Sequence, residues 1–547
     1  MEIVTTNQTA LKAAAHLAGL LNWQGPIESI AFTEDSIRAA LERLNDTLYV
    51  VRVGSQVGLT HAGTVVPTSQ PGAAEVLAIL NPLPAYRLGD ASFNASYGTR
   101  YAYYGGAMAS AIASVPMVVA LGKAGLLGSF GAAGLPPARL EAAIQQVQAE
   151  LPNGPYAFNL IHSPSEEALE RNAVALYLRY GVPVVEASAF LDLTPHIVLY
   201  RAAGLSRAAD GSVQIKNRVI AKLSRREVAQ KFMQPAPANL LSQLVQEGKI
   251  SQEQAALAQR VPMADDITVE ADSGGHTDNR PLVCLIPAIL ALRDELQEKY
   301  HYATPVRIGA AGGISTPGSA LAAFAMGAAY VVTGSVNQAC VESGACDHTR
   351  DLLAKASMAD VMMAPSADMF EMGVKVQVLR TGTMFAMRAT KLYELYSKYD
   401  SVEQIPADER EKLEKQVFRR GMDEIWADTV KFFTERDPEQ IARANDNSKR
   451  KMALIFRWYL GLSSRWSATG EKGRELDYQI WCGPSIGPFN DWTRGTYLAE
   501  PTNRHVVDVA LHLLTGGAYL ARIQSLRNAG LQVASGLAAY TPRTALI

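Results

Sequence analysis

The segment that decides the fold is Pro305-Val306-Arg307-Ile308-Gly309-Ala310-Ala311-Gly312-Gly313-Ile314, in which an apolar run leads directly into two adjacent glycines. Pro317 follows shortly after, and proline is common in the first turn of a helix. The pattern predicts a buried strand, a tight turn and a helix. Glycines let a backbone approach a phosphate closely, and the first amides of the helix would point their N–H groups at it.

A second glycine-bearing turn, Thr333-Gly334-Ser335, closes the next apolar run. Paired turns of this kind after the seventh and eighth strands are where a (β/α)₈ barrel usually binds a phosphate. The two turns therefore predict a phosphate site. The alternative is that both are tight turns with no ligand.

Working outward from these turns, short apolar runs alternate with helical segments from Tyr101 onward. Such alternation predicts a parallel sheet, and eight units closed on themselves make a barrel. An open doubly wound sheet is the alternative, but its Gly-x-Gly-x-x-Gly fingerprint is missing after an early strand. The expected strands are Tyr103–Met108, Leu126–Gly131, Tyr156–Ile161, Pro183–Ala187, Val219–Leu223, Ile267–Ala271, Val306–Ala310 and Tyr330–Gly334. The expected helices include Pro137–Leu151, Ser165–Tyr180, Arg225–Met233, Pro281–Tyr300 and Thr316–Met326.

The two flanks of the barrel differ from it in pattern. Tyr49–Val53 and Val57–Leu59, separated by Gly54-Ser55, predict a β-hairpin within a small α+β cap. Gln234–Pro262 is expected to leave the barrel as a polar helical excursion, and the last helix, Arg504–Leu526, is apolar enough to pack back onto it. The expected division is a cap over 1–100, a (β/α)₈ TIM barrel over 101–340, and a helical region over 341–547.

Composition and charge exclude several classes of protein. The chain has 547 residues, 48% hydrophobic and 19% charged, which is typical of a folded protein larger than one core. A net charge of −2 and a pI of about 6.5 do not favour a nucleic-acid partner. The four cysteines predict buried free thiols and no metal site. The chain start lacks a signal peptide, and the most apolar stretch, Ala107–Leu127, suits a barrel better than a membrane span, so a cytoplasmic location is expected.

The loop after the sixth expected strand is Glu270-Ala271-Asp272-Ser273-Gly274-Gly275-His276-Thr277-Asp278-Asn279-Arg280. In a barrel it would open at the mouth beside the phosphate turns. Gly274 and Gly275 would let the loop lie flat against a ring system. His276 could donate a proton or a hydrogen bond at neutral pH, while a structural hydrogen bond is the alternative role for this residue.

Three other strand ends could face the same ligand. Gly105-Gly106-Ala107-Met108 offers close backbone approach, and Asn159 offers an amide that can donate and accept. Lys222 is a cation inside an apolar segment, where it needs a partner. An electron-rich cofactor ring would supply that partner, and a buried carboxylate is the alternative.

Together these pieces resemble the nitronate monooxygenase and flavin-dependent enoyl reductase superfamily of barrels over about residues 101–340. Nearly the whole chain resembles the PfaD family, which acts as stand-alone, trans-acting enoyl reductases of polyunsaturated fatty acid and polyketide synthases. The superfamily usually has Glu-Ala-Gly-Gly-His where this chain has Asp272-Ser273-Gly274-Gly275-His276, so the role of the acidic position is open. The closer resemblance is carried by the N-terminal region, Asp272–Pro281, Met369–Gln377 and Trp481–Pro484.

The resemblance implies an FMN cofactor reduced by NADPH or NADH, and hydride transfer from flavin N5 to the β-carbon of an enoyl thioester. It implies that the substrate is carried by an acyl carrier protein, which would dock on the helical region, and that His276 is the catalytic residue. A homodimer is expected from the commonest symmetry. The cofactor-binding residues so implied are Ala107, Met108, Asn159, Lys222, Gly274, Gly275, Ala311, Gly312, Gly313, Gly334 and Ser335.

Three other functions fit parts of the pattern. An oxygenase of the same fold would oxidise an alkyl nitronate, although a nitronate needs no carrier-protein surface and so leaves the long helical region without a purpose. A non-catalytic barrel could serve as an assembly partner of a synthase. A phosphate-binding lyase or aldolase barrel would contain no flavin.

Overall fold

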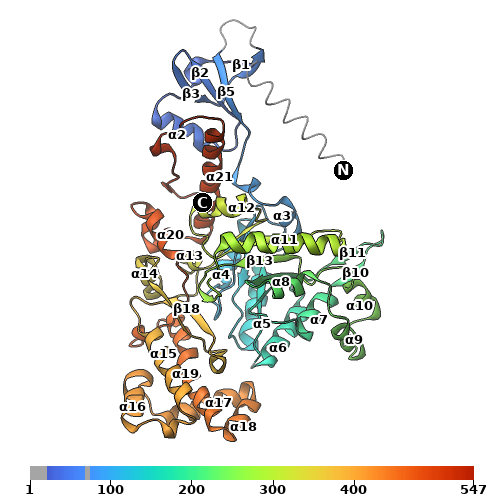
Figure 1. Ribbon diagram of the computed structural model, residues 1–547, viewed down its shortest axis with the longest axis vertical. Helices are drawn as coiled ribbons and strands as arrows, with labels where there is room; N and C mark the ends of the chain where they lie inside the picture. Colours follow the sequence, from blue (N-terminus) through green and yellow to red (C-terminus); the bar gives the residue numbers. More distant parts are fainter. Residues whose placement is uncertain (1–20, 68–73, 165) are drawn as a thin grey trace.

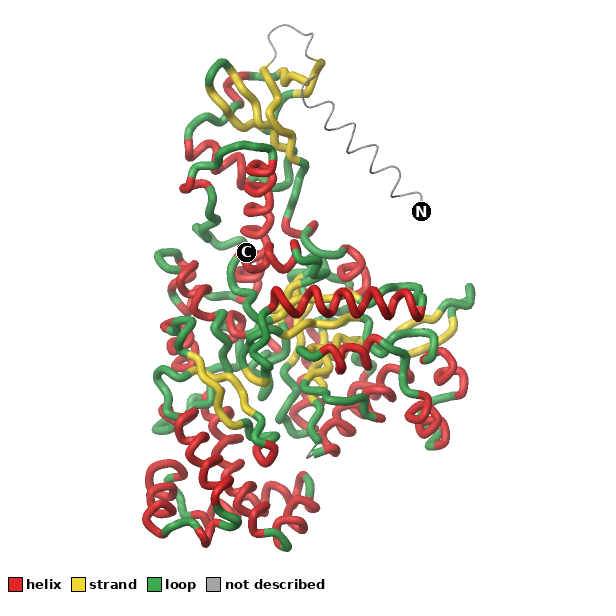
Figure 2. The backbone as a smooth tube through the Cα atoms, viewed as in Figure 1, coloured by secondary structure: helices red, strands yellow, loops and turns green. Residues whose placement is uncertain are grey.

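The computed structural model describes residues 21–67, 74–164 and 166–547, and its centre is a closed barrel of eight parallel strands (Figures 1 and 2). Every strand pair around the barrel is parallel, and β16 pairs with β6 to close it. The barrel predicted from the alternating pattern is therefore confirmed. In barrel order from β6, the strands are β6 (Tyr103–Gly105), β7 (Leu127–Phe130), β8 (Ala157–Ile161), β9 (Val184–Ser188), β12 (Arg218–Leu223), β13 (Asp266–Glu270), β15 (Arg307–Ala311) and β16 (Val331–Thr333).

Helices surround the barrel because its strands carry apolar side chains on both faces. The predicted excursion over 234–262 forms two helices that pack on α7, outside the barrel strands. The surrounding helices are α4 (Val115–Lys123), α5 (Pro137–Glu150), α6 (Glu167–Tyr180), α7 (Pro195–Ala203), α8 (Arg226–Met233), α11 (Leu282–Tyr300), α12 (Pro317–Ala325) and α13 (Ser335–Gln338). The excursion holds α9 (Ala238–Gln246) and α10 (Gln252–Ala258), and β10 (Leu205–Arg207) and β11 (Val213–Ile215) form a hairpin before β12.

A short helix, α3 (Ala91–Tyr97), closes the amino-terminal end of the barrel. The Phe93 ring stacks on Tyr330 with 4.3 Å between ring centroids. Tyr97 donates a hydrogen bond to the Asp266 carboxylate, which also receives both Nε and Nη2 of Arg307 at 2.7 Å. Helix α3 is therefore part of the barrel core, although it precedes the first barrel strand.

The N-terminal region forms a five-stranded antiparallel sheet in the order β3-β2-β5-β1-β4. The predicted hairpin is confirmed, since Val53 pairs with Gln56 across Gly54, whose φ of +60° suits glycine. Helix α21 (Val506–Asn528) runs from the barrel helices α4 and α12 to this sheet (Figure 1). The elements are β1 (Leu21–Gln24), α2 (Glu34–Glu42), β2 (Leu48–Val53), β3 (Gln56–Thr60), β4 (Thr64–Pro67) and β5 (Ala74–Leu80).

The region after the barrel is mostly helical, as expected, but it also contains two strands that the sequence pattern did not single out. β17 (Val361–Pro365) and β18 (Lys375–Leu379) form an antiparallel sheet with β14 (Gly275–His276), the short strand in the loop after β13. The helices are α14 (Asp347–Lys355), α15 (Phe385–Lys398), α16 (Ala407–Lys412), α17 (Met422–Arg436), α18 (Pro438–Asn445), α19 (Ser448–Thr469), α20 (Ile486–Thr493) and α21.

The four cysteines are free thiols, but the expectation that all are buried is wrong for Cys284, which is exposed on α11. Cys340 and Cys482 are buried, and Cys346 is half-buried. Within the described ranges, α21 is the helix whose length and composition would allow it to span a membrane, and 78% of its most apolar window is buried in the fold.

Candidate active site at the carboxyl end of the barrel

The predicted site residues lie around one end of the barrel. Parallel strands place all their carboxyl ends on the same side, so the loops that follow them surround a common mouth. Named with the strand that each ends or follows, they are Ala107 and Met108 (β6), Asn159 (β8), Lys222 (β12), Gly274, Gly275 and His276 (β13), Ala311, Gly312 and Gly313 (β15), and Gly334 and Ser335 (β16).

The glycines of the two predicted phosphate turns differ in the space beside them. A Cβ at Gly313 (φ +77°) or at Gly334 would meet nothing within 4 Å. A Cβ at Gly312 (φ +81°) would lie 2.7 Å from the carbonyl carbon of Ala271. Gly312 therefore serves the packing of two loops, whereas Gly313 and Gly334 leave room for a ligand.

The helix that follows the first turn, α12, is capped by its own side chains. Thr316 Oγ1 accepts a hydrogen bond from the Ser319 amide at 3.2 Å, and Ser319 Oγ accepts from the amides of Ser315 (2.9 Å) and Thr316 (3.0 Å). Pro317 has no N–H. Among the first amides of α12, the capping box binds that of Ser319, so the prediction that these amides point at a phosphate is wrong for Ser319 and stays a prediction for Gly318.

Lys222 has a carboxylate partner at the mouth. Its Nζ lies 2.8 Å from Glu270 Oε1, and both side chains are less than a fifth exposed. The Ser273 hydroxyl donates to the same oxygen at 3.2 Å. Burial lowers the pKa of the Lys222 ammonium, but the carboxylates of Glu270 and Glu186 raise that pKa by more, so the ammonium is charged at neutral pH. Lys222 therefore has the carboxylate partner that the alternative expected, while its position beside a cofactor ring stays a prediction.

Glu186 is a buried acid that sequence reasoning missed, because it lies within the apolar strand β9. Its Oε2 accepts hydrogen bonds from Tyr104 Oη (2.5 Å) and from the Ala107 amide (2.9 Å). Its Oε1 is buried and has no hydrogen-bond partner among the described residues. Asn159 Nδ2 donates to the Glu186 backbone carbonyl at 3.1 Å and to Ser188 Oγ at 2.9 Å. Buried polar atoms normally have partners, so Glu186 Oε1 is an acceptor left available beside the predicted site.

His276 is held by an acid from the C-terminal region. Its Nε2 lies 2.9 Å from Asp368 Oδ2, and the two side chains are 30% and 32% exposed. Burial lowers the pKa of the His276 imidazole, but the charge and hydrogen bond of Asp368 and the charge of Glu270 raise that pKa above its usual value. Burial likewise raises the pKa of the Asp368 carboxyl, and His276 lowers it by more, so the acid is ionised. No local pattern identified Asp368, which lies 92 residues from His276 in the chain.

Asp272, the acidic position whose role was open, is bound within the loop. Its Oδ1 accepts from Asn279 Nδ2 at 2.8 Å and from Gln377 Nε2 at 2.7 Å. The carboxylate beside Lys222 is that of Glu270, two residues earlier. Asp272 therefore shapes the loop that carries His276.

A cavity lies at the other end of the barrel. It has a volume of about 420 Å³ and is lined by residues such as Asp90, Arg293 and Arg307, none of which belongs to the loops at the mouth. A cavity of about 30 Å³ borders Asn159 at the carboxyl end. Of these two cavities, the larger therefore does not lie at the predicted site. The polar groups at the mouth identify the candidate site better than cavity volume does.

Three family models match the chain, and two of the matched ranges overlap over residues 399–422. The model described as nitronate monooxygenase matches residues 104–422, more than half of the chain. The fatty acid synthase subunit PfaD N-terminal domain matches residues 23–82, which include most of the N-terminal sheet. The inserted helical domain of [acyl-carrier-protein] S-malonyltransferase matches residues 399–478.

Curated relatives are longer than this chain. A polyunsaturated fatty acid synthase component of Thraustochytrium sp. is 51% identical over 92% of this chain and 34% of its own length. Polyketide biosynthesis protein PksE of Bacillus subtilis is 46% identical over 81% of this chain and 58% of its own length. The chain thus spans about a third of the first relative and less than two thirds of the second.

One solved structure is matched by this chain over the whole length of the solved domain. The enoyl reductase domain of MlnA, from the macrolactin biosynthesis cluster of Bacillus amyloliquefaciens, is 39% identical and has a TM-score of 0.77. The match covers 81% of this chain and 100% of that domain. The chain therefore belongs to the nitronate monooxygenase family of barrel proteins, in the group that carries the PfaD N-terminal domain.

Proposed function

We propose that this chain is an FMN-dependent enoyl reductase that uses NAD(P)H to reduce the α,β double bond of an enoyl thioester on an acyl carrier protein. The observation that carries the proposal is the match to the whole of an enoyl reductase domain, at 39% identity over 81% of this chain. The polar groups at the barrel mouth support it, because a proton donor in the loop after β13 and a largely buried cation near the end of the neighbouring strand β12 lie at the same mouth.

The residues at the mouth fit an FMN cofactor on two observations. Open space beside Gly313 and Gly334 would admit a phosphate, which the Ser335 hydroxyl would bind as well. The buried Oε1 of Glu186 would accept a hydrogen bond from a ligand N–H. The residues that would lie near the flavin ring are Ala107, Met108, Asn159, Lys222, Gly274 and Gly275, with Ala311 and Gly312 supporting the phosphate turn. FMN, once reduced by NAD(P)H, supplies a hydride for the β-carbon of the enoyl group.

The second half of the reduction needs a proton at the α-carbon, and His276 is the residue placed to provide it or to polarise the thioester carbonyl. When the imidazole is protonated, Nε2–H is held by Asp368, and Nδ1–H is the second donor. Because Asp368 and Glu270 raise the pKa of His276, more of the ring is protonated near neutral pH than in an isolated histidine. The Lys222 ammonium adds fixed positive charge, which stabilises negative charge that develops at the mouth.

The test is a visible spectrum of the purified protein, followed without oxygen by NADPH and then by crotonyl-acyl carrier protein. The proposal requires flavin bands, their bleaching by NADPH and their recovery on addition of the thioester. Recovery with oxygen alone would favour a nitronate oxygenase, the activity that gives the matched family model its name. Absence of flavin would refute the cofactor and leave an assembly role in a synthase.

The carrier protein is proposed because relatives of this chain are named as parts of polyunsaturated fatty acid and polyketide synthesis. The comparison to make is between crotonyl-acyl carrier protein and crotonyl-pantetheine. A carrier that contacts the chain should lower KM with little change in kcat, because its contacts bind substrate and transition state alike. Equal KM values would contradict a docked carrier.

A further inference from the structure

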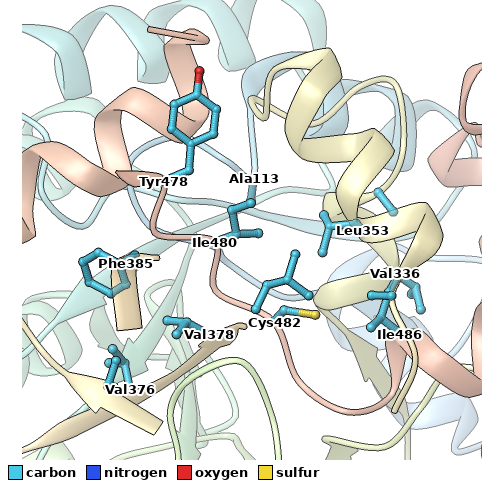
Figure 3. Packing of buried hydrophobic residues seen from close by; sticks show 14 of the residues in the cluster. Ala113, Val336, Leu353, Val376, Val378, Phe385, Tyr478, Ile480, Cys482 and Ile486 are labelled. Atoms are coloured by element: carbon cyan, nitrogen blue, oxygen red, sulfur yellow. The ribbon is translucent and has the colours of Figure 1, made fainter. Parts of the chain in front are cut away.

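The two segments Met369–Gln377 and Trp481–Pro484 have no role in the chemistry proposed above, yet both reach the loop that carries His276. Residues 480–483, here called the return segment, follow the helical region and come back to the barrel mouth. Within the return segment, Ile480 and Cys482 are fully buried. They lie in one apolar cluster with Val376, Val378 and Phe385 (Figure 3).

The return segment continues the edge of β18 that β14 occupies. Ile480 accepts a hydrogen bond from the Leu379 amide at 2.8 Å, and Trp481 forms an antiparallel bridge with Val378. On the same strand, Gln377 pairs with Gly275 of β14. The return segment and the His276 loop therefore meet along β18.

Gly274 and Gly483 pack directly against each other's backbone where the return segment contacts the His276 loop. A Cβ at Gly483 would lie 2.8 Å from the Gly274 nitrogen, and a Cβ at Gly274 would lie 2.8 Å from the Cys482 nitrogen. Neither position has room for a side chain. On the β18 side, Gln377 Nε2 donates to Asp272 Oδ1 at 2.7 Å and to the Ser273 carbonyl at 2.8 Å. The loop before His276 is thus held from two directions.

The return segment also reaches the second glycine-bearing turn. The Gly483 amide donates a hydrogen bond to Ser335 Oγ at 2.9 Å, across 148 residues of sequence. A hydroxyl has one donor and two acceptor positions. Ser335 Oγ accepts from the Gly483 amide and also lies within side-chain hydrogen-bond reach of the buried Cys482 thiol, so two residues of the return segment fix this hydroxyl.

We propose that Gly483 is a positioning residue for the cofactor: the return segment sets the His276 loop and the Ser335 hydroxyl in one arrangement, so that a flavin phosphate binds tightly only when that segment is in place. This inference rests on the proposed function, since it takes the ligand to be FMN. If the inference holds, the C-terminal region positions two parts of the binding site, and no loop of the barrel does this.

The test compares dissociation constants of FMN for the flavin-free full-length protein, measured by quenching of flavin fluorescence. Gly483→Ala inserts a methyl group against Gly274, and FMN should bind about tenfold to hundredfold more weakly, the range for one lost hydrogen bond to a charged group. The control is Gly122→Ala, whose Cβ would lie 2.8 Å from the Pro155 carbonyl oxygen on the outside of the barrel. That variant should lose thermal stability and keep the affinity for FMN.

The second variant is Gln377→Ala, which removes the two hydrogen bonds from Gln377 to Asp272 and Ser273. It should still fold, because a smaller side chain introduces no steric clash. It should also weaken FMN binding. In a Ser335→Ala background, the effect of Gly483→Ala should become smaller, since part of it acts through the Ser335 hydroxyl.

Equal FMN affinity in wild type and Gly483→Ala would overturn the inference, as would an equal loss in Gly122→Ala, which would attribute the effect to general destabilisation. Fully additive effects of Gly483→Ala and Ser335→Ala would also overturn it. Failure of the wild-type protein to bind FMN would instead refute the proposed function, so the two failures are distinguishable.

Discussion

The two ends of the barrel both hold buried charge, but they differ in how completely that charge is satisfied. At the amino-terminal end, the Asp266 carboxylate takes two hydrogen bonds from Arg307 and one from Tyr97, and Arg307 also donates to Ser92 and Ser96. At the carboxyl end, Glu186 keeps one oxygen without a partner among the described residues.

This difference predicts a separate role for each end of the barrel. In the amino-terminal network both carboxylate oxygens of Asp266 are used, and removing Arg307 would leave an uncompensated charge. An end with an available acceptor, a charged Lys222 and a partly exposed His276 has the groups needed to bind a ligand and to move a proton. We therefore expect one end of the barrel to serve stability and the other to serve chemistry.

The largest expected effect is on the stability end. Arg307→Met leaves the fully buried Asp266 without its cation, and the free energy of unfolding should fall by about 3–5 kcal/mol. Denaturation of the flavin-free protein by guanidinium chloride measures this. The matched control, Arg207→Met, breaks an exposed pair with Glu253 and should cost less than about 1 kcal/mol. Similar losses in both variants would contradict the contrast between the two ends.

The second effect concerns the chemical end. His276→Ala should keep FMN but slow the reoxidation of reduced flavin by a crotonyl thioester on the order of a hundredfold, because a positioned proton donor is lost. Rapid mixing under anaerobic conditions measures the single-turnover rate. An unchanged rate would remove His276 from the mechanism.

The third effect concerns the charge at the mouth. Lys222→Met removes a cation that would stabilise the anionic reduced flavin, so the two-electron midpoint potential should fall by about 30–60 mV, the equivalent of about 1.4–2.8 kcal/mol. The potential is measured by equilibration with reference dyes. Lys216→Met, at an exposed position just before β12, is the control and should leave the potential unchanged. A shift of the same size in both variants would contradict a specific role for Lys222.

The smallest effect is a shift in pH dependence. Asp368 raises the pKa of His276, so the rate that depends on the protonated ring falls at higher pH than it would without this acid. Asp368→Asn should move that fall to lower pH, because the charge and the hydrogen bond that raise the pKa of His276 are lost. The same linkage gives a stability contribution that is complete below the unfolded-state pKa of about 6.5 and is lost as pH rises through the raised folded-state value. A single-turnover rate profile with an unmoved alkaline limb would show that Asp368 does not control the titration.

Local patterns predicted much of the fold because the relevant forces act over a few residues. The eight barrel strands followed from apolar runs bounded by turns, and the hairpin around Gly54 followed from its turn chemistry. The strand β18, Lys375–Leu379, has apolar residues alternating with polar ones at its start. It was not predicted as a strand, because it lies in a region that was assigned as helical. Glu186 gave no signal, since a polar residue in an apolar strand shows its role only through its partners.

The sequence by itself determined the barrel, the glycine-bearing turns and the loop that ends in His276, because strand periodicity and turn residues are local properties. The tertiary structure alone decided that Asp368 binds His276 and that Gly483 binds Ser335, since these pairs lie 92 and 148 residues apart and depend on how the C-terminal region returns to the mouth. Hydrogen bonds between residues so far apart produce no periodic pattern in the sequence, so they cannot be predicted from it. They exist only because the packing of β18 and the return segment brings the backbones together.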